Sequence, residues 1–97
     1  MPKFGLLARL QAKPGKEKEV EALLIGALPL AEQEAGTRTW YAFRLDASTF
    51  GIFDTFDDET GREAHLAGQI AQALMAKADE LLAVPPQIDK IDLLATK

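Results

Sequence analysis

The single histidine of the chain, His65, is the side chain best suited to proton transfer. An imidazole is the one group whose ordinary pKa lies near neutral pH, so it can accept or donate a proton there without help from its surroundings. His65 lies in a stretch whose apolar residues recur with helical spacing. It could act as a general base or as a hydrogen-bond partner for a bound molecule. The alternative is a half-buried histidine that only bonds to a neighbouring side chain.

A second candidate, Asp54, is an acid in an otherwise apolar strand. It lies among Ile52, Phe53 and Phe56. A carboxylate in such surroundings must find a partner or shift its pKa upward, because burial disfavours the charged form. Two roles are open: an acid–base group that faces a pocket, or a structural partner of a basic side chain, which is the favoured role. The candidate partners are Arg44, Arg38 and His65.

The composition argues against several other kinds of site. The 97 residues include no cysteine, which excludes a disulfide scaffold and any thiolate-bound metal. There is no metal-ligand spacing, glycine-rich phosphate loop or nucleophile elbow, so we expect no metal or other cofactor. The net charge of −4 leaves no basic stripe for nucleic acid. No apolar run is long enough for a membrane span or a signal peptide, so we expect a cytoplasmic protein with no membrane partner.

The first half of the chain predicts a strand followed by a helix. Residues 3–12 alternate apolar and mixed positions, which is typical of a strand, and Pro14-Gly15 ends it. Residues 16–35 carry apolar side chains at helical spacing. Pro29 should break this helix, because its ring clashes with the carbonyl four residues earlier. Gly36 suits a left-handed cap at the end of the helix.

The second half predicts a hairpin, a helix and a last strand. Residues 37–45 and 50–56 are rich in aromatic and β-branched side chains and are joined by a short polar loop. Asp57 can cap the following helix, which should run to about Ala83 with a break at Gly68. Residues 87–95 then alternate as a final strand after Pro85-Pro86.

The order β-α-β-β-α-β over residues 1–97 predicts one α+β domain with the ferredoxin-like fold. Right-handed crossovers then give a four-stranded antiparallel sheet with both helices on one face. Strand alternation places four side chains on the helix-covered face: Trp40, Phe56, Ile52 and Leu6. The opposite face carries Tyr41, Phe43 and Phe53, which are too apolar to remain in water. We therefore expect a homodimer through this second face.

The order of elements and several short motifs resemble the antibiotic biosynthesis monooxygenase domain, a family of dimeric α/β barrels in which two sheets pack together. The resemblance covers essentially the whole chain. The motifs that carry it are Ala8-Arg9-Leu10, Ala12-Lys13-Pro14-Gly15-Lys16, Glu34-Ala35-Gly36, Phe53-Asp54-Thr55-Phe56-Asp57 and Glu63-Ala64-His65-Leu66. Three positions depart from the family pattern. The third strand of the family commonly ends in Glu-x-Trp, where Asp54 stands for the acid and Phe56 for the tryptophan, and its second strand usually carries a tyrosine where Trp40 stands.

The resemblance implies a pocket between sheet and helices more firmly than it implies a reaction. Family members oxidise quinols or polycyclic phenols with O2 and no cofactor, which here implies His65 and Asp54 as catalytic residues. Trp40, Phe56, Ile52 and Leu6 would then bind a small aromatic molecule. The alternatives are a non-catalytic ligand-binding or stress-associated dimer, and an enzyme similar to the lactone isomerases. The haem-degrading branch is poorly matched, because Ala8 stands where that branch has asparagine.

Overall fold

The computed structural model describes all residues from Met1 to Lys97 and has the predicted order of elements, with each helix divided in two. No helix combines the length and the apolar character that a membrane crossing requires. The elements are β1 (Phe4–Gln11), α1 (Glu17–Gly26), α2 (Leu28–Glu32), β2 (Thr37–Arg44), β3 (Thr49–Phe56), α3 (Glu59–Leu66), α4 (Gln69–Leu81) and β4 (Gln87–Asp92).

The four strands form one antiparallel sheet in the order β2-β3-β1-β4. This order confirms the predicted ferredoxin-like topology, because β1 and β3 lie in the centre and each crossover passes over one helical segment. The register places Asp54 directly between Leu6 of β1 and Trp40 of β2. These three residues therefore share one face of the sheet.

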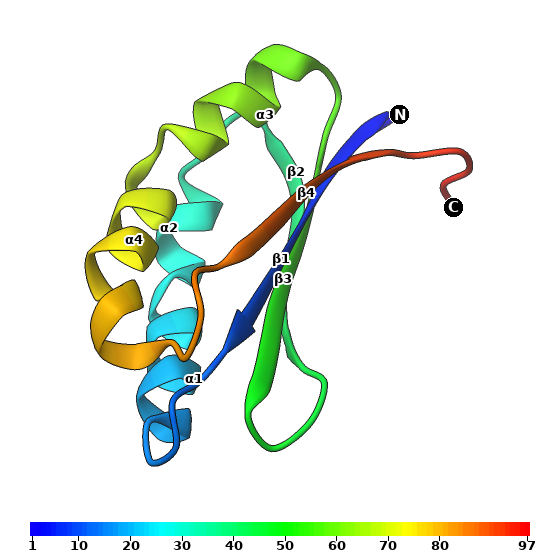
Figure 1. The fold of residues 1–97 in the computed structure, drawn as a ribbon. Helices are drawn as coiled ribbons and strands as arrows, with labels where there is room; N and C mark the ends of the chain where they lie inside the picture. Colours follow the sequence, from blue (N-terminus) through cyan, green and yellow to red (C-terminus); the bar gives the residue numbers. More distant parts are fainter.

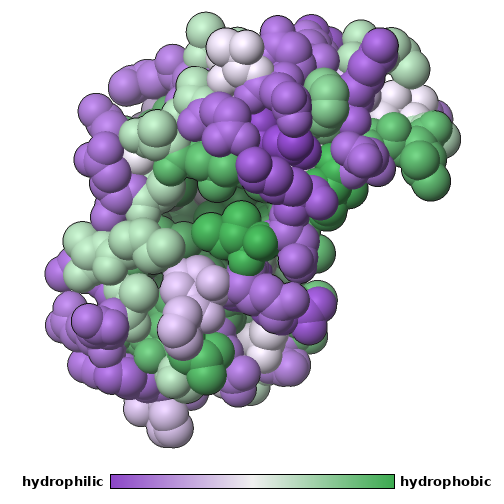
Figure 2. All heavy atoms as spheres, turned by 45° about the horizontal axis from the view of Figure 1, so that its top comes forward, coloured by the Kyte–Doolittle hydropathy of each residue, from purple (hydrophilic) through white to green (hydrophobic).

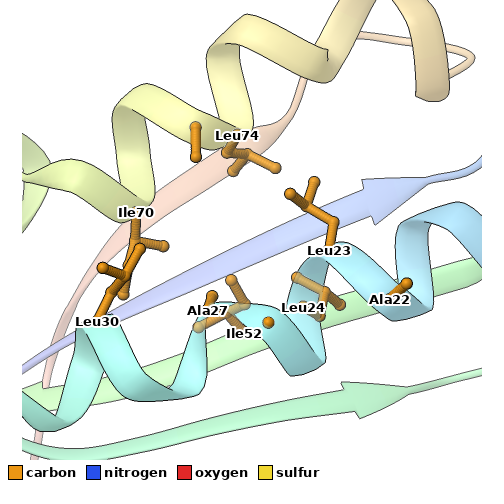
Figure 3. A pocket seen from close by; sticks show the side chains of 10 residues that line it. Ala22, Leu23, Leu24, Ala27, Leu30, Ile52, Ile70 and Leu74 are labelled. Atoms are coloured by element: carbon orange, nitrogen blue, oxygen red, sulfur yellow. The ribbon is translucent and has the colours of Figure 1, made fainter.

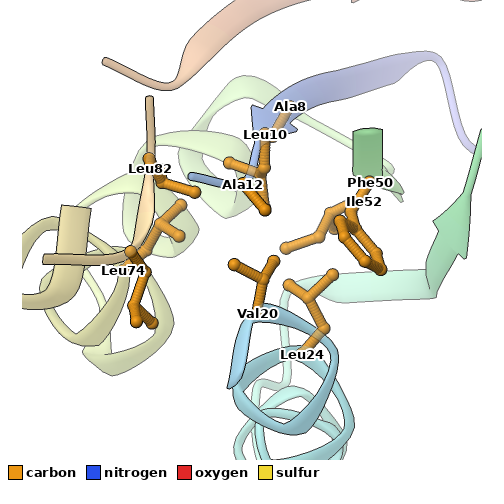
Figure 4. Packing of buried hydrophobic residues seen from close by; sticks show 10 residues of the cluster. Ala8, Leu10, Ala12, Val20, Leu24, Phe50, Ile52, Leu74 and Leu82 are labelled. Atoms are coloured by element: carbon orange, nitrogen blue, oxygen red, sulfur yellow. The ribbon is translucent and has the colours of Figure 1, made fainter. Parts of the chain in front are cut away.

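All four helices cover the same face of the sheet (Figure 1). The main core lies between them and the sheet, where Leu10, Phe50 and Ile52 meet Val20 and Leu24 of α1 (Figure 4). The predicted division of strand residues between the two faces is confirmed for β1 and β3, because Leu6, Ile52 and Phe56 are all buried on the helix side. The core thus surrounds the strand segment that carries Asp54.

Two helix breaks occur where the sequence predicts them. α1 gives way to α2 at Ala27, two residues before Pro29, which lies in the first turn of α2. Proline is tolerated in a first turn because the N–H that it lacks has no helical acceptor there. α3 ends at Leu66, and Gly68 is the residue that precedes α4.

Three local predictions are wrong. The cap of α3 is Asp58, not Asp57; an oxygen of Asp58 accepts a hydrogen bond from the Gly61 N–H at 2.8 Å, whereas Asp57 pairs with Arg38. Gly36 is not left-handed, because Gly15 is the only residue with a positive φ. β4 ends at Asp92, three residues before the predicted limit.

Gly36 has a different reason to be glycine. A Cβ atom on Gly36 would lie 2.9 Å from the Cα of Gly61, and one on Gly61 would lie 2.8 Å from the carbonyl oxygen of Gly36. No real Cβ tolerates such distances to backbone atoms, so two glycines are needed for this contact. The contact joins the start of β2 to the first turn of α3.

The sheet face opposite the helices carries aromatic rings that lie across glycines. The Phe43 ring occupies the space above Gly51, where a Cβ would come within 2.3 Å of it, and the Phe53 ring lies beside Gly5. Tyr41 on the same face is more than half exposed. The rings therefore cover backbone instead of projecting from the sheet, which leaves a broad apolar surface.

Candidate functional site

Asp54 is the most deeply buried charged side chain, with 1% of its surface exposed. It lies on the helix-facing side of β3, because strand alternation places it with Phe50, Ile52 and Phe56. Arg44 and Arg38 do not pair with it, since they bind Glu21 and Asp57. Of the three partners predicted for Asp54, the structure brings together only Asp54 and His65.

His65 joins Asp54 to a second acid, Glu34. The Nε2 atom of His65 lies 2.8 Å from Oδ2 of Asp54, and its Nδ1 atom lies 2.6 Å from Oε1 of Glu34. The Thr37 hydroxyl donates to the same glutamate oxygen at 2.8 Å, which fixes the carboxylate. Phe56 packs against the imidazole, with 5.4 Å between the ring centroids. His65 is therefore held between two acids from different parts of the chain.

Sequence reasoning did not identify Glu34 as a site residue. It appears there only within the motif Glu34-Ala35-Gly36. In the structure it follows α2, and its carboxylate is one-fifth exposed, while the His65 side chain is 8% exposed. No sequence pattern singles out Glu34, because it is brought to His65 by the contact between Gly36 and Gly61, which only the structure shows.

The Asp54 carboxylate keeps unused hydrogen-bonding capacity. Its Oδ2 atom is close to His65, but the ring N–H is not directed along the line between them, so the contact is an ion pair without an aligned hydrogen bond. The Oδ1 atom has no partner in the protein, and neither has the buried indole N–H of the adjacent Trp40. Buried groups without partners are rare, and a bound hydroxyl group or water would satisfy them.

The surroundings shift the pKa values of both groups. Burial raises the pKa of Asp54 above its usual value, although the neighbouring His65 opposes the shift. Burial alone lowers the pKa of His65, but the adjacent carboxylates of Asp54 and Glu34 outweigh it and raise the pKa to about 9. The imidazole is therefore protonated at pH 7, so a proton acceptor at this site must be one of the two carboxyl groups, and only that of Asp54 lines the small cavity described below.

This arrangement is not suited to binding a metal ion. Asp54 and Glu34 contact opposite nitrogens of one imidazole ring, so their oxygens diverge and cannot converge on a common ion. No group of three potential ligands elsewhere in the chain is positioned to hold one.

Two cavities adjoin the site. A small one of about 40 Å³ is lined by Asp54 and His65, together with Leu6, Ile52 and six other residues. A larger one of about 270 Å³ lies between α1 and α2 on one side and α4 on the other (Figure 3). Trp40 and Phe56 line neither cavity. Trp40 instead borders a groove beside Glu34, so the structure brings together four of the six residues named from the sequence around the small cavity.

One solved structure identifies a close relative of the chain. The protein NE2512 from Nitrosomonas europaea, of unknown function, is 56% identical in sequence, with a TM-score of 0.98 over 100% of this chain and 94% of that chain. This chain belongs to the NE2512 family. No protein-family model and no curated protein matches the chain.

The fold of this NE2512 family member is the antibiotic biosynthesis monooxygenase fold. A Nitrosomonas europaea protein provisionally assigned as an antibiotic biosynthesis monooxygenase has a TM-score of 0.84 at 12% identity, covering 95% of this chain and 99% of that chain. A similarly assigned protein from Caulobacter crescentus has a TM-score of 0.81 at 18% identity, covering 97% and 92%. The resemblance predicted from the sequence is thus confirmed for the fold.

We expect the stability of this NE2512 family member to fall as the pH rises from about 6.5 to about 9. The pKa of His65 increases from 6.5 to about 9 on folding, so the folded state binds this proton more tightly. The contribution is complete below pH 6.5 and is lost as the pH rises through 9, and a shift of this size is worth about 3 kcal/mol. Urea unfolding at a series of pH values measures it. His65→Gln should remove this pH dependence. An equally steep profile for the variant would show that the pH dependence does not come from His65.

Proposed function

We propose that the chain is a cofactor-independent monooxygenase that oxidises a phenolic or quinol-like small molecule with O2. The observation that carries the proposal is the buried Asp54 carboxylate, which has a free oxygen, lines a cavity and lies against a protonated His65. The fold shared with provisionally assigned antibiotic biosynthesis monooxygenases supports the same class of reaction.

In this proposal Asp54 accepts a proton from the substrate and His65 does not. A carboxylate whose pKa is raised by burial is a stronger base than one in water. His65 keeps its proton and places a positive charge beside the developing substrate anion, which it stabilises in a water-poor site. The electron-rich anion then reacts directly with O2. With a phenol or hydroquinone that has a free ring position, O2 adds at a ring carbon and the resulting hydroperoxide loses water. One oxygen atom of O2 thus enters the product as a quinone carbonyl, and the other leaves in water.

Asp54→Asn is expected to lower the rate of substrate-dependent O2 uptake by about a hundredfold or more, because the amide cannot accept a proton. The assay is O2 consumption with a panel of hydroquinones and phenols, per mole of folded protein. Asp79→Asn, an exposed acid on α4, is the matched control and should retain the wild-type rate. A substrate that is turned over equally fast by wild type and Asp54→Asn would refute the role of Asp54.

A second candidate function, small-ligand binding without catalysis, is favoured by one observation. Every side chain that lines the larger cavity is aliphatic or absent, so this cavity offers no group that could take part in a reaction. If no phenol supports O2 uptake but ligands bind, this second function is the correct one.

We also propose that the protein is a homodimer through the open sheet face. Tyr41, Phe43 and Phe53 share this face with Leu7 and Ile91, and no helix covers it. The isolated chain exposes 6084 Å². A compact monomer of this mass is expected to expose about 5,500 Å². The excess and the apolar face support burial against a second copy, with an interface on the order of 2,000 Å².

A further inference from the structure

The larger cavity has an unusually uniform lining. It is formed by residues from α1, α2, α4 and β3, and none of them is aromatic or carries a polar side-chain atom. Leu23 and Leu30 face Ile70 and Leu74 across it (Figure 3). The chain has seven aromatic residues, one Trp, one Tyr and five Phe, yet none contributes. Such a lining suits an aliphatic body and offers no ring for an extended aromatic system to stack on.

The two cavities are neighbours. Ile52, Ile70 and Leu74 line both, so the aliphatic space adjoins the space beside Asp54 and His65 along these three side chains. At the other end, Ala22 and Gly26 are exposed at the rim, where the larger cavity opens. Apolar atoms also gather in a hollow with polar margins on the face shown in Figure 2. A ligand that enters from the rim would therefore meet the charged group last.

The volumes of the two cavities indicate which part of such a ligand each cavity can hold. The space of about 40 Å³ at Asp54 holds a hydroxyl group but not a ring, since a cavity that accepts benzene measures about 150 Å³. The larger cavity, about 270 Å³, has room for one ring and a short side chain. Several fused rings with substituents would exceed it.

The charge of the site selects the head group. Two carboxyl groups, those of Asp54 and Glu34, flank the single imidazole of His65, so acids outnumber bases at the site. A further carboxylate, brought in as the head group of a ligand, would meet the free Oδ1 atom of Asp54 with no unpaired cation beside it, and burying it there is unfavourable. A neutral hydroxyl group can instead donate a hydrogen bond to the free Oδ1 atom of Asp54.

We infer that the ligand of this site is a single-ring phenol or quinol with an aliphatic substituent, bound with its hydroxyl group at Asp54 and its substituent toward Ala22 and Gly26. The inference rests on the proposed function, because it names the substrate class of the same site. It narrows that class to one ring with an alkyl chain, because the aliphatic lining favours an alkyl chain over a second aromatic ring, and it excludes carboxylates. Binding is measured without oxygen, so a failure of catalysis and a failure of recognition can be distinguished.

The test is titration calorimetry of the 97-residue protein at pH 7 under nitrogen with matched probes. 4-Butylphenol should bind at least tenfold more tightly than phenol, because each buried methylene group contributes about fourfold in affinity. Butylbenzene lacks the donor and 4-butylbenzoate carries a negative charge, and each should bind at least tenfold more weakly than 4-butylphenol. Equal or tighter binding of 4-butylbenzoate or 2-naphthol, or no binding of 4-butylphenol, would overturn the inference.

Two variants and one control test where the aliphatic substituent of the ligand binds. Ala73→Leu fills the cavity and should weaken 4-butylphenol binding at least tenfold. Ala76→Leu places the same side chain on an exposed position of α4 and should leave binding unchanged. Leu30→Ala enlarges the cavity and should shift the preference from 4-butylphenol toward 4-hexylphenol, which guards against a misfolded Ala73→Leu protein. If Ala76→Leu weakens binding as much as Ala73→Leu, or Leu30→Ala leaves the preference unchanged, the ligand lies elsewhere.

Discussion

His65→Ala is expected to lower the free energy of unfolding at pH 7 by about 3–5 kcal/mol, the range measured when one partner of a buried ion pair is removed. The variant would leave Asp54 buried with no positive charge beside it, and its Oδ1 atom already has no partner. Glu34, whose carboxylate is partly exposed, would lose the same partner. Urea unfolding followed by circular dichroism gives the difference.

Two further variants test the physical reason for this loss. Adding Asp54→Asn to His65→Ala should restore part of the stability, because the amide removes the unpaired charge. Arg38→Ala breaks the exposed ion pair with Asp57 and should change stability by less than about 1 kcal/mol. If His65→Ala is no more destabilising than Arg38→Ala, His65 does not hold a buried charge in place.

The second large effect concerns assembly. Phe43→Asp should convert the dimer to monomers or prevent folding, because it would place an unpaired carboxylate on the proposed interface. Phe43 covers Gly51 on the open face, so the substitution also exposes that backbone. Light scattering at micromolar concentration should give twice 10.6 kDa for the wild type and 10.6 kDa for any soluble variant.

The control for assembly is Ile25→Asp. Ile25 is an apolar residue of α1 that is 67% exposed, and it lies on the helical layer, away from the open sheet face. Its replacement should leave the molecular mass of the assembly unchanged. A wild-type mass of 10.6 kDa, or dissociation by Ile25→Asp alone, would contradict an interface at the sheet.

Much of the fold follows from local patterns in the sequence. The alternation of β1 and the aromatic hairpin of β2 and β3 fix which residues share a face, so the opposition of Trp40 and Asp54 across the two strands was predictable. Pro29 and Gly68 mark the helix breaks for reasons that act within one turn of helix. The error at Asp57 arose because Asp58 competes for the same cap, and the error at Gly36 arose because α2 ends at Glu32 with Gln33 as its cap, three residues before the glycine.

The site was less accessible to sequence reasoning. The Glu34–His65 contact spans 31 residues and depends on how α2 ends against α3. Without Glu34, the pKa of His65 could not be inferred, so a general base was as plausible as a permanent cation. The aliphatic lining of the larger cavity was equally hidden, because residues such as Leu23 and Ile70 have the same spacing as core residues.

The contact between Gly36 and Gly61 means that the residues that position the charged groups are not the residues that line the cavities. Glu34 precedes Gly36 by two residues, and His65 follows Gly61 by one helical turn, so a junction of bare backbone sets the distance between the acid and the imidazole. Neither glycine lines a cavity beside Asp54. The residues that determine ligand shape can therefore change in size while the charged group keeps its alignment. Related chains could exchange one ligand for another by altering helical side chains alone, with the acid–base chemistry inherited intact.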